Sequence, residues 1–191
     1  MNYYNENGIE YIKNTINCDM SNLYNLFFKY INPKAKKILD IGFGSGRDMI
    51  YFKNKGYDVF GIDSCELFCE KAKEIGIDNV NCINVLDMNY FDEFDAIWAC
   101  ASLLHIDKDE LNDVFKKCDR ALKEEGIMYC SFKYGDFSGI RKERYFHDLN
   151  EDNFINYIKD TSFEIIEILL TYDVRTDRQD EKWLNVILKK K

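Results

Sequence analysis

Residues 37–50, KILDIGFGSGRDMI, combine three local patterns that together decide the fold. Residues 38–41 form an apolar run typical of a buried strand, and Asp40 lies near its end. A helical pattern begins at Arg47. Between them lie three glycines at alternate positions: Gly42, Gly44 and Gly46. Because glycine carries no Cβ, a ligand can approach this backbone closely and meet the N–H groups at the start of the helix. The stretch therefore predicts a ligand-binding turn at the carboxyl edge of an α/β sheet.

The spacing of the glycines distinguishes two kinds of adenosine-containing ligand. A dinucleotide fingerprint, G-x-G-x-x-G/A, needs a small third residue for close packing of helix and strand, and here Arg47 stands in that position. The pattern D-x-G-x-G-x-G instead resembles the first motif of class I S-adenosylmethionine (SAM) methyltransferases. The amino-acid end of SAM carries both charges, so Asp40 can hold its ammonium group and Arg47 its carboxylate. An ordinary glycine turn is the alternative interpretation.

Alternating strand and helix patterns predict a Rossmann-like, doubly wound α/β fold. The expected sheet has seven strands, mostly parallel with the last strand antiparallel, and helices on both faces. The last two strands are close in sequence and should pair as an antiparallel hairpin. The expected strands are residues 38–41, 58–62, 79–84, 94–99, 127–132, 163–172 and 182–189. The expected helices are residues 10–17, 21–31, 47–55, 64–76, 107–123 and 150–159.

The composition fits a single domain over residues 1–191. The chain is 46% hydrophobic, which suffices for a substantial core, and its net charge of −8 disfavours nucleic acid as a partner. Seven cysteines at irregular spacing predict no disulfide framework, and Cys65 and Cys69 are interpreted as buried apolar residues rather than metal ligands. No signal peptide or membrane-spanning run is found, so we expect a cytoplasmic protein that binds no membrane and no metal. The oligomeric state stays open.

Further candidate cofactor residues lie at the ends of the expected strands. Asp63 ends the second strand about twenty residues after the glycine turn, where one carboxylate can accept two hydrogen bonds from a ribose diol. Ser64 follows it as the expected N-cap of the next helix, and Ala99 ends the fourth strand. Residues 1–33 form a helical segment in which Tyr11 is expected either to close over the cofactor or to cover only an edge of the sheet.

Several segments resemble a bacterial group of small class I methyltransferases, of the tellurite-resistance and ubiquinone-biosynthesis types. The resemblance covers nearly the whole chain, and four segments carry it: residues 98–105 (WACASLLH), 131–135 (SFKYG), 173–175 (DVR) and 183–185 (WLN). It implies S_N2 methyl transfer from SAM to a small molecule, with S-adenosylhomocysteine (SAH) as product. It also implies that Asp87 approaches the adenine amino group, with Leu86 or Met88 beside the ring. A solvent-exposed carboxylate is the alternative for Asp87.

His105 is the candidate catalytic residue, because imidazole titrates near neutral pH and can accept a proton from an oxygen or nitrogen nucleophile. Its alternative role is a polar side chain packed between loop and helix. A second set of side chains could hold a small, anionic acceptor, although surface ion pairs are the alternative. Its members are Lys133, Tyr134, Arg144, Arg175 and Arg178. The polar connection 134–150 is the candidate substrate lid.

One kind of methyltransferase is excluded by sequence. Enzymes that methylate the amino groups of DNA bases use an Asn/Asp/Ser-Pro-Pro-Tyr/Phe motif after the fourth strand, and the only proline here is Pro33. Two other classes stay open. One is a SAM-binding sensor or partner subunit without turnover, and the other is a nicotinamide-dependent oxidoreductase, which Arg47 disfavours.

Overall fold

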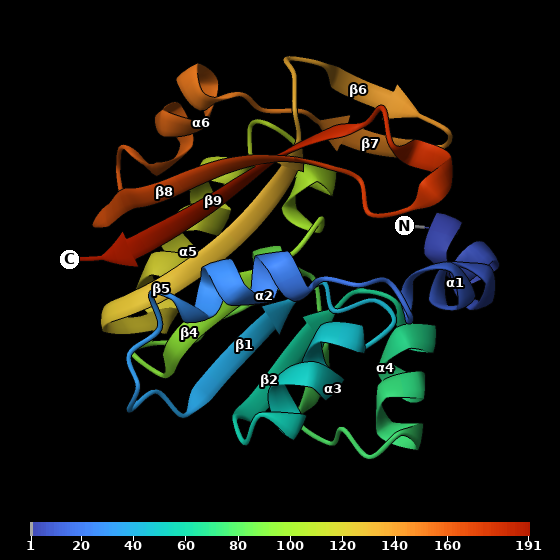
Figure 1. Ribbon diagram of the computed structural model, residues 1–191, viewed down its shortest axis with the longest axis horizontal. Helices are drawn as coiled ribbons and strands as arrows, with labels where there is room; N and C mark the ends of the chain where they lie inside the picture. Colours follow the sequence, from blue (N-terminus) through green and yellow to red (C-terminus); the bar gives the residue numbers. More distant parts are fainter. Residues whose placement is uncertain (1) are drawn as a thin grey trace.

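The computed structural model describes residues 2–191, in which helices cover both faces of a seven-stranded sheet (Figure 1). The strand order is β3-β2-β1-β4-β5-β9-β8. Strands β1 to β5 pair in parallel, whereas β9 is antiparallel to both β5 and β8. The fold class predicted from the sequence is therefore confirmed. The strands are β1 Lys37–Ile41, β2 Asp58–Asp63, β3 Val80–Cys82, β4 Phe94–Ala99, β5 Leu122–Lys133, β8 Phe163–Tyr172 and β9 Lys182–Lys190.

The two helical layers bury separate apolar clusters against the sheet. Phe27, Phe52 and Phe68, from α2, α3 and α4, belong to one cluster. Phe115 and Phe154, from α5 and α6, belong to the other. The helices are α1 Asn2–Thr15, α2 Ser21–Phe28, α3 Arg47–Asn54, α4 Glu66–Glu74, α5 Leu111–Ala121 and α6 Glu151–Ile158, with 3-10 turns η1 Val85–Asp87, η2 Leu103–His105 and η3 Thr176–Arg178.

The ends of the helices differ from those predicted. Helix α1 begins at Asn2 rather than at residue 10. Ser64 is not the N-cap of α4: the cap position is Cys65, whose N–H donates to the Asp63 carboxylate at 2.9 Å. Helix α5 begins at Leu111, later than expected. Asp63 thus fixes the residue before the helix, and within residues 2–191 no side chain caps the first N–H groups of α4.

Residues 134–150 contain a second, two-stranded sheet that the sequence did not predict. Strands β6 Ser138–Arg141 and β7 Arg144–His147 pair as an antiparallel hairpin. The hairpin lies beyond one end of the main sheet, on the side where α1 also lies (Figure 1). Its strands have four residues each and mix polar with apolar side chains, so no alternating apolar pattern marks them in the sequence.

The sheet topology determines where a ligand can bind. Strand β1 pairs with β2 on one side and with β4 on the other. The order of the strands therefore reverses at β1: β2 and β3 extend the sheet toward one edge, and β4 and β5 extend it toward the other. In open α/β sheets, ligands bind at the carboxyl ends of the strands beside such a switch point.

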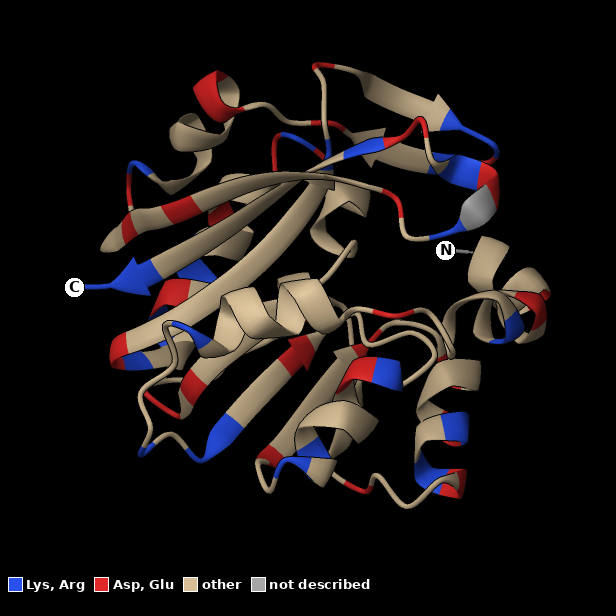
Figure 2. Ribbon diagram, viewed as in Figure 1, with Lys and Arg blue, Asp and Glu red and all other residues tan. Residues whose placement is uncertain are grey.

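Lys and Arg are interspersed with Asp and Glu over the sheet and helices in the view of Figure 2.

Candidate active site

The glycine turn after β1 is shaped for close approach by its neighbours. Gly42 and Gly44 have φ angles of 69° and 53°, which side-chain-bearing residues rarely adopt. A Cβ on Gly42 would lie 2.5 Å from Ser102 Cβ, and a Cβ on Gly44 would lie 2.9 Å from Tyr11 Cε1. Both positions therefore require glycine, and Tyr11 of α1 lies directly over the turn.

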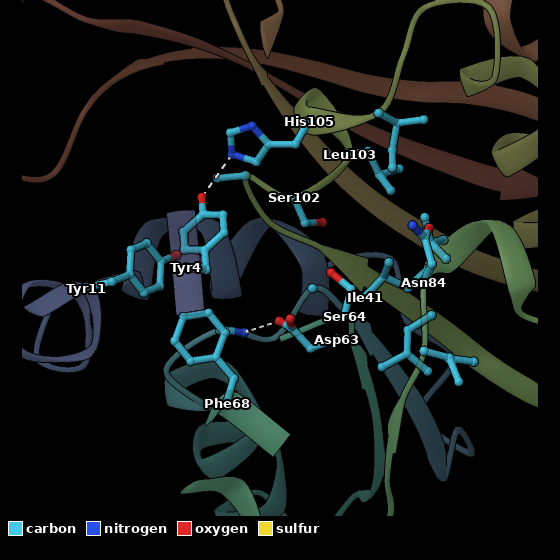
Figure 3. Close-up of a pocket in the computed structure, with 17 residues that line it drawn as sticks. Tyr4, Tyr11, Ile41, Asp63, Ser64, Phe68, Asn84, Ser102, Leu103 and His105 are labelled. Carbon is cyan, nitrogen blue, oxygen red and sulfur yellow. Dashed lines mark hydrogen bonds between the residues drawn. The ribbon is translucent and has the colours of Figure 1, made fainter. Parts of the chain in front are cut away.

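Asp63 ties the turn to the end of β2. Its Oδ2 accepts a hydrogen bond from the Gly44 N–H at 3.0 Å, and burial raises the pKa of this carboxyl. A cavity of about 80 Å³ opens here, and we call it the first cavity (Figure 3). Its lining includes Tyr11, Gly42, Gly44, Asp63, Ser64 and Asn84. All of these residues except Asn84 were expected near the cofactor from the sequence, so five expected residues meet at the first cavity.

The other expected cofactor residues do not line this cavity. Asp87 is exposed in η1, and Met88 and Ala99 are fully buried in the core. Leu86 and Gly46 are also absent from the lining, and Gly46 is the left-handed residue before α3. The wall on the η1 side is made one turn earlier by Ile83, Asn84 and Val85.

Asn84 was missed by the sequence analysis. Its side chain accepts the Leu86 N–H at 3.0 Å and so begins the 3-10 turn η1. An asparagine directly after a short strand is a common turn-forming signal, which could have indicated this position. Strand β3 has three residues, and the expected adenine contacts at 86–88 lie outside the lining of the first cavity.

Asp40 and Arg47 lie on the other side of the glycine turn. Asp40 is 2% exposed, and its Oδ2 is buried without a hydrogen-bond partner in residues 2–191. Burial, followed by the negative charge of Asp48, raises the pKa of Asp40 well above its usual value. Arg47 forms a two-pronged ion pair with Asp48, with N···O distances of 2.7 and 2.8 Å. Burial lowers the pKa of Arg47, but the Asp48 charge outweighs it and the net shift is upward.

A second cavity of about 320 Å³ adjoins the first and shares Tyr4, Tyr11 and His105 with it. Arg47 lines this second cavity, and so do four of the five residues expected to hold an acceptor: Lys133, Arg144, Arg175 and Arg178. The fifth, Tyr134, is 38% exposed, and its hydroxyl donates to Glu151 instead.

Three of these four cations already have carboxylate partners. Lys133 pairs with Glu181, and Arg178 lies 3.6 Å from Asp177. Arg175 donates to both oxygens of Asp173. Within residues 2–191 no carboxylate lies within 4.0 Å of Arg144, and its buried Nε has no hydrogen-bond partner. Arg144 is therefore the cation in this set with capacity for an anionic ligand.

His105 is held in one tautomer between two partners. Its Nδ1 lies 2.7 Å from the carbonyl of Tyr145, which can only accept, so Nδ1 carries the proton. Its Nε2 then accepts from the Tyr4 hydroxyl at 3.0 Å (Figure 3). Burial lowers the pKa of His105 to about 4, so the ring is neutral at physiological pH. Tyr4 was not predicted, because nothing local marks a residue 101 positions away from its partner.

Arg144 also donates to the Tyr4 hydroxyl, at 2.9 Å. Tyr4 of α1 thus forms hydrogen bonds both to the loop after β4 and to β7.

No group of three His, Cys, Asp or Glu side chains suited to a metal occurs in residues 2–191. Over the same range, no helix has the length and apolar character needed to cross a membrane.

The fold and the residues around the glycine turn are those expected of a SAM-dependent methyltransferase, and the chain is similar to known proteins of this class. A family model described as "Methyltransferase domain" matches residues 39–130. Phosphoethanolamine N-methyltransferase of Plasmodium falciparum is 30% identical over 146 residues, or 73% of this chain and 52% of the relative. The putative methyltransferase YqeM of Bacillus subtilis is 30% identical over 149 residues, or 71% and 58%. This chain thus spans little more than half the length of these curated relatives.

The fold is shared with solved methyltransferase structures. The 1,6-didemethyltoxoflavin-N1-methyltransferase of Burkholderia thailandensis, which contains bound SAH, superposes with a TM-score of 0.79 at 17% identity, over 99% of this chain and 84% of that one. Residues 39–130 thus match the methyltransferase-domain family, and the chain resembles class I SAM-dependent methyltransferases in sequence and in fold.

Proposed function

We propose that this protein methylates a small molecule that carries one anionic group and an amine or hydroxyl nucleophile. The observation that carries the proposal is Arg144, a half-buried cation without a carboxylate partner in residues 2–191, whose buried Nε makes no hydrogen bond there and which lies beside the His105–Tyr4 pair. An arginine fork binds phosphate or carboxylate well. The P. falciparum relative is named for phosphoethanolamine, which joins an amine to a phosphate, and this supports an acceptor of that kind.

The residues around the glycine turn fit SAM. Asp40 has a buried oxygen without a partner within residues 2–191, suited to an ammonium group, and Arg47 has free N–H groups for a carboxylate. Asp63 faces the first cavity with Ser64, where a ribose diol would bind, and Tyr11 would close over it. Asn84 would take the place near the adenine that the sequence predicted for Asp87, with Leu86, Met88, Ala99 and Gly46 supporting the wall from behind.

The protein's own groups would orient the acceptor and receive its proton. When bound, SAM supplies an electrophilic methyl group for in-line attack by the acceptor's lone pair. Arg144 would hold the acceptor's anionic group. The nucleophile's proton would pass to the Tyr4 oxygen while the Tyr4 proton passes to His105 Nε2, which is unprotonated because its pKa is about 4. Lys133, Arg175 and Arg178 would shape this cavity as ion pairs.

Two segments would enclose the reactants. Residues 1–33 would cover the cofactor through Tyr4 and Tyr11, and residues 134–150 would act as the substrate lid through Arg144.

Segments 98–105 and 131–135 support a narrower kinship with small bacterial methyltransferases of the tellurite-resistance and ubiquinone-biosynthesis types. The free cysteines support a reducing, cytoplasmic location.

The proposal is tested by SAH release from a panel of small amines and alcohols, each with and without a phosphate or carboxylate. We expect turnover only with anionic acceptors. Arg144→Gln should raise their KM about tenfold to a hundredfold, because a charged hydrogen bond is lost, while SAH affinity stays within about twofold. Arg141→Gln is the matched control on the same hairpin, since Arg141 is paired with Asp148.

His105→Ala should lower kcat and leave SAH affinity unchanged. Binding of SAH without turnover on any acceptor would instead favour a sensor or partner subunit. Turnover of neutral acceptors that is insensitive to Arg144→Gln would contradict the anionic acceptor.

A further inference from the structure

Asp48 is a buried carboxylate behind the glycine turn that the proposed function does not use. It is the second residue of α3 and is 6% exposed. Its Oδ1 accepts from Arg47 Nε at 2.7 Å and from the Tyr24 hydroxyl at 2.5 Å. Its Oδ2 accepts from Arg47 Nη2 at 2.8 Å and from Trp98 Nε1 at 2.9 Å. Four donors saturate a carboxylate, so Asp48 has no capacity left for a ligand.

The two aromatic donors to Asp48 are themselves fixed. Tyr24 of α2 stacks on Tyr51 with ring centroids 3.8 Å apart. Trp98 of β4 stacks on Tyr129 with centroids 4.0 Å apart. Asp48 is thus clamped by a helix and a central strand that are far apart in the sequence, and its position does not depend on a ligand.

This clamp determines which edge of Arg47 is free. Asp48 occupies Nε and one hydrogen of Nη2, and Nη1 donates to the Thr15 carbonyl at 3.4 Å. The edge between Nη1 and Nη2 remains, and Arg47 lines the second cavity. Two parallel N–H groups on one guanidinium edge match the geometry of a carboxylate.

Stability alone does not account for this ion pair. Replacing a buried ion pair with apolar groups of similar volume is often neutral or stabilising, so burying the pair is a weak source of folding free energy. Orientation is what the pair supplies here, because an arginine side chain otherwise samples many rotamers.

We propose that Asp48 is a positioning residue, which holds the free edge of the Arg47 guanidinium toward the carboxylate of SAM. The inference rests on the proposed function, in which Arg47 binds that carboxylate. In this proposal Asp48 touches neither the cofactor nor the acceptor, and it acts on SAM binding by orienting Arg47.

The test compares two ligands that differ only at the amino-acid end. SAH and 5′-methylthioadenosine share the adenosine and the thioether, but only SAH has the carboxylate. We expect Asp48→Asn to raise the calorimetric Kd for SAH about tenfold or more, since an oriented charged contact is lost, and to leave the Kd for methylthioadenosine within about twofold. Tyr24→Phe removes one donor to Asp48 and keeps the ion pair, so it should weaken SAH binding less, with the same discrimination.

Asp95→Asn is the matched control. Asp95 lies at the opposite end of β4 from the site and accepts from the Lys36 and Lys37 N–H groups. Asp95→Asn should lower the free energy of unfolding and leave the Kd values for SAH and methylthioadenosine unchanged. An equal loss for both ligands in Asp48→Asn would overturn the inference, and so would unchanged SAH binding. If Asp48→Asn does not fold, Tyr24→Phe decides by the same criterion. Wild-type protein that fails to bind SAH would overturn the proposed function instead.

Discussion

At the residue scale, Asp40 combines full burial with an incomplete set of hydrogen bonds. Its Oδ2 has no partner within the described residues, and burial together with the Asp48 charge raises its pKa. The unfolded chain releases this proton near pH 4, whereas the folded protein retains it to higher pH. Between the two pKa values the unfolded state binds fewer protons, so this group lowers the stability of the folded protein as pH rises.

Asp40→Asn removes that pH dependence, because an amide of the same shape cannot ionise. We expect the variant and the wild type to melt at similar temperatures at pH 4, and the variant to melt a few degrees higher at pH 8, in the absence of cofactor. SAH binding should weaken, since the ammonium loses its anionic partner. Thermal unfolding from pH 4 to 8 measures the first effect and calorimetry the second.

Asp95 provides a control of opposite sign. Burial raises its pKa, but hydrogen bonds from Lys37 and its neighbours outweigh burial and lower it. A carboxyl with a lowered folded pKa stabilises the protein above its unfolded pKa and loses this effect as pH falls. Asp95→Asn should therefore melt lower than the wild type at pH 8. The same sign in both variants would contradict the assignment for Asp40.

The residues that could be predicted from the sequence are those whose partners are nearby in the chain. Gly44 and Asp63 lie at the ends of adjacent strands, so strand pattern and spacing place them together. The contacts of Tyr4 with His105 and of Asp48 with Trp98 could not be predicted, because these partners come from other elements at separations of 101 and 50 positions. Long-range hydrogen bonds leave no local periodic signal in the sequence.

At the element scale, α1 limits access to the first cavity. That cavity has about 80 Å³, below the roughly 300 Å³ typical of ligand pockets, and Tyr4 and Tyr11 of α1 are in its wall. Tyr4 also bonds to His105 and Arg144. We therefore expect cofactor exchange to require α1 to move, and the Tyr4 hydroxyl opposes the movement together with the contacts of Asn5 to Cys65 and of the Thr15 carbonyl to Arg47.

Tyr4→Phe should accelerate cofactor exchange. It removes two hydrogen bonds of about 1 kcal/mol each, so we expect the dissociation rate of SAH to rise several-fold, and up to about thirtyfold, as measured by stopped-flow competition. Tyr3→Phe is the control, because it keeps the ring that lies 4.5 Å from the Arg144 guanidinium. An unchanged dissociation rate in Tyr4→Phe would show that α1 is not the barrier.

The main-sheet elements were more predictable than the segment 134–150. Apolar runs such as 94–99 and 127–132 gave β4 and the core of β5, because a buried strand needs continuous apolar residues. The hairpin β6–β7 has two four-residue strands of mixed polarity, of which β6 is partly exposed and β7 ends in two buried residues, and Lys142 and Glu143 at its turn have φ angles of 45° and 64°. Neither is a glycine, so the usual residue signal for such a turn is missing.

At the scale of the whole molecule, the site joins parts that are otherwise separate. Loops after β1, β2 and β4 contribute to the first cavity together with α1. The apolar clusters on both faces of the sheet share strands: Ile38 and Leu39 of β1 belong to different clusters, and so do Trp98 and Ile97 of β4. Loss of either layer of helices would therefore expose these central strands, and we expect the main sheet to unfold as one unit.

SAH should consequently shift a single unfolding transition. At a concentration of 100 times Kd it adds about 2.7 kcal/mol to the free energy of unfolding. For a chain of this size, each kcal/mol corresponds to roughly 2–4 °C, so we expect Tm to rise by about 5–10 °C. NAD at the same concentration should leave Tm unchanged, because Arg47 stands where a dinucleotide turn needs a small residue. Asp63→Ala should reduce the SAH shift by at least half, since the ribose loses its acceptor. An equal shift with NAD, or a transition that SAH splits in two, would contradict a site that binds SAM and couples both layers of the sheet.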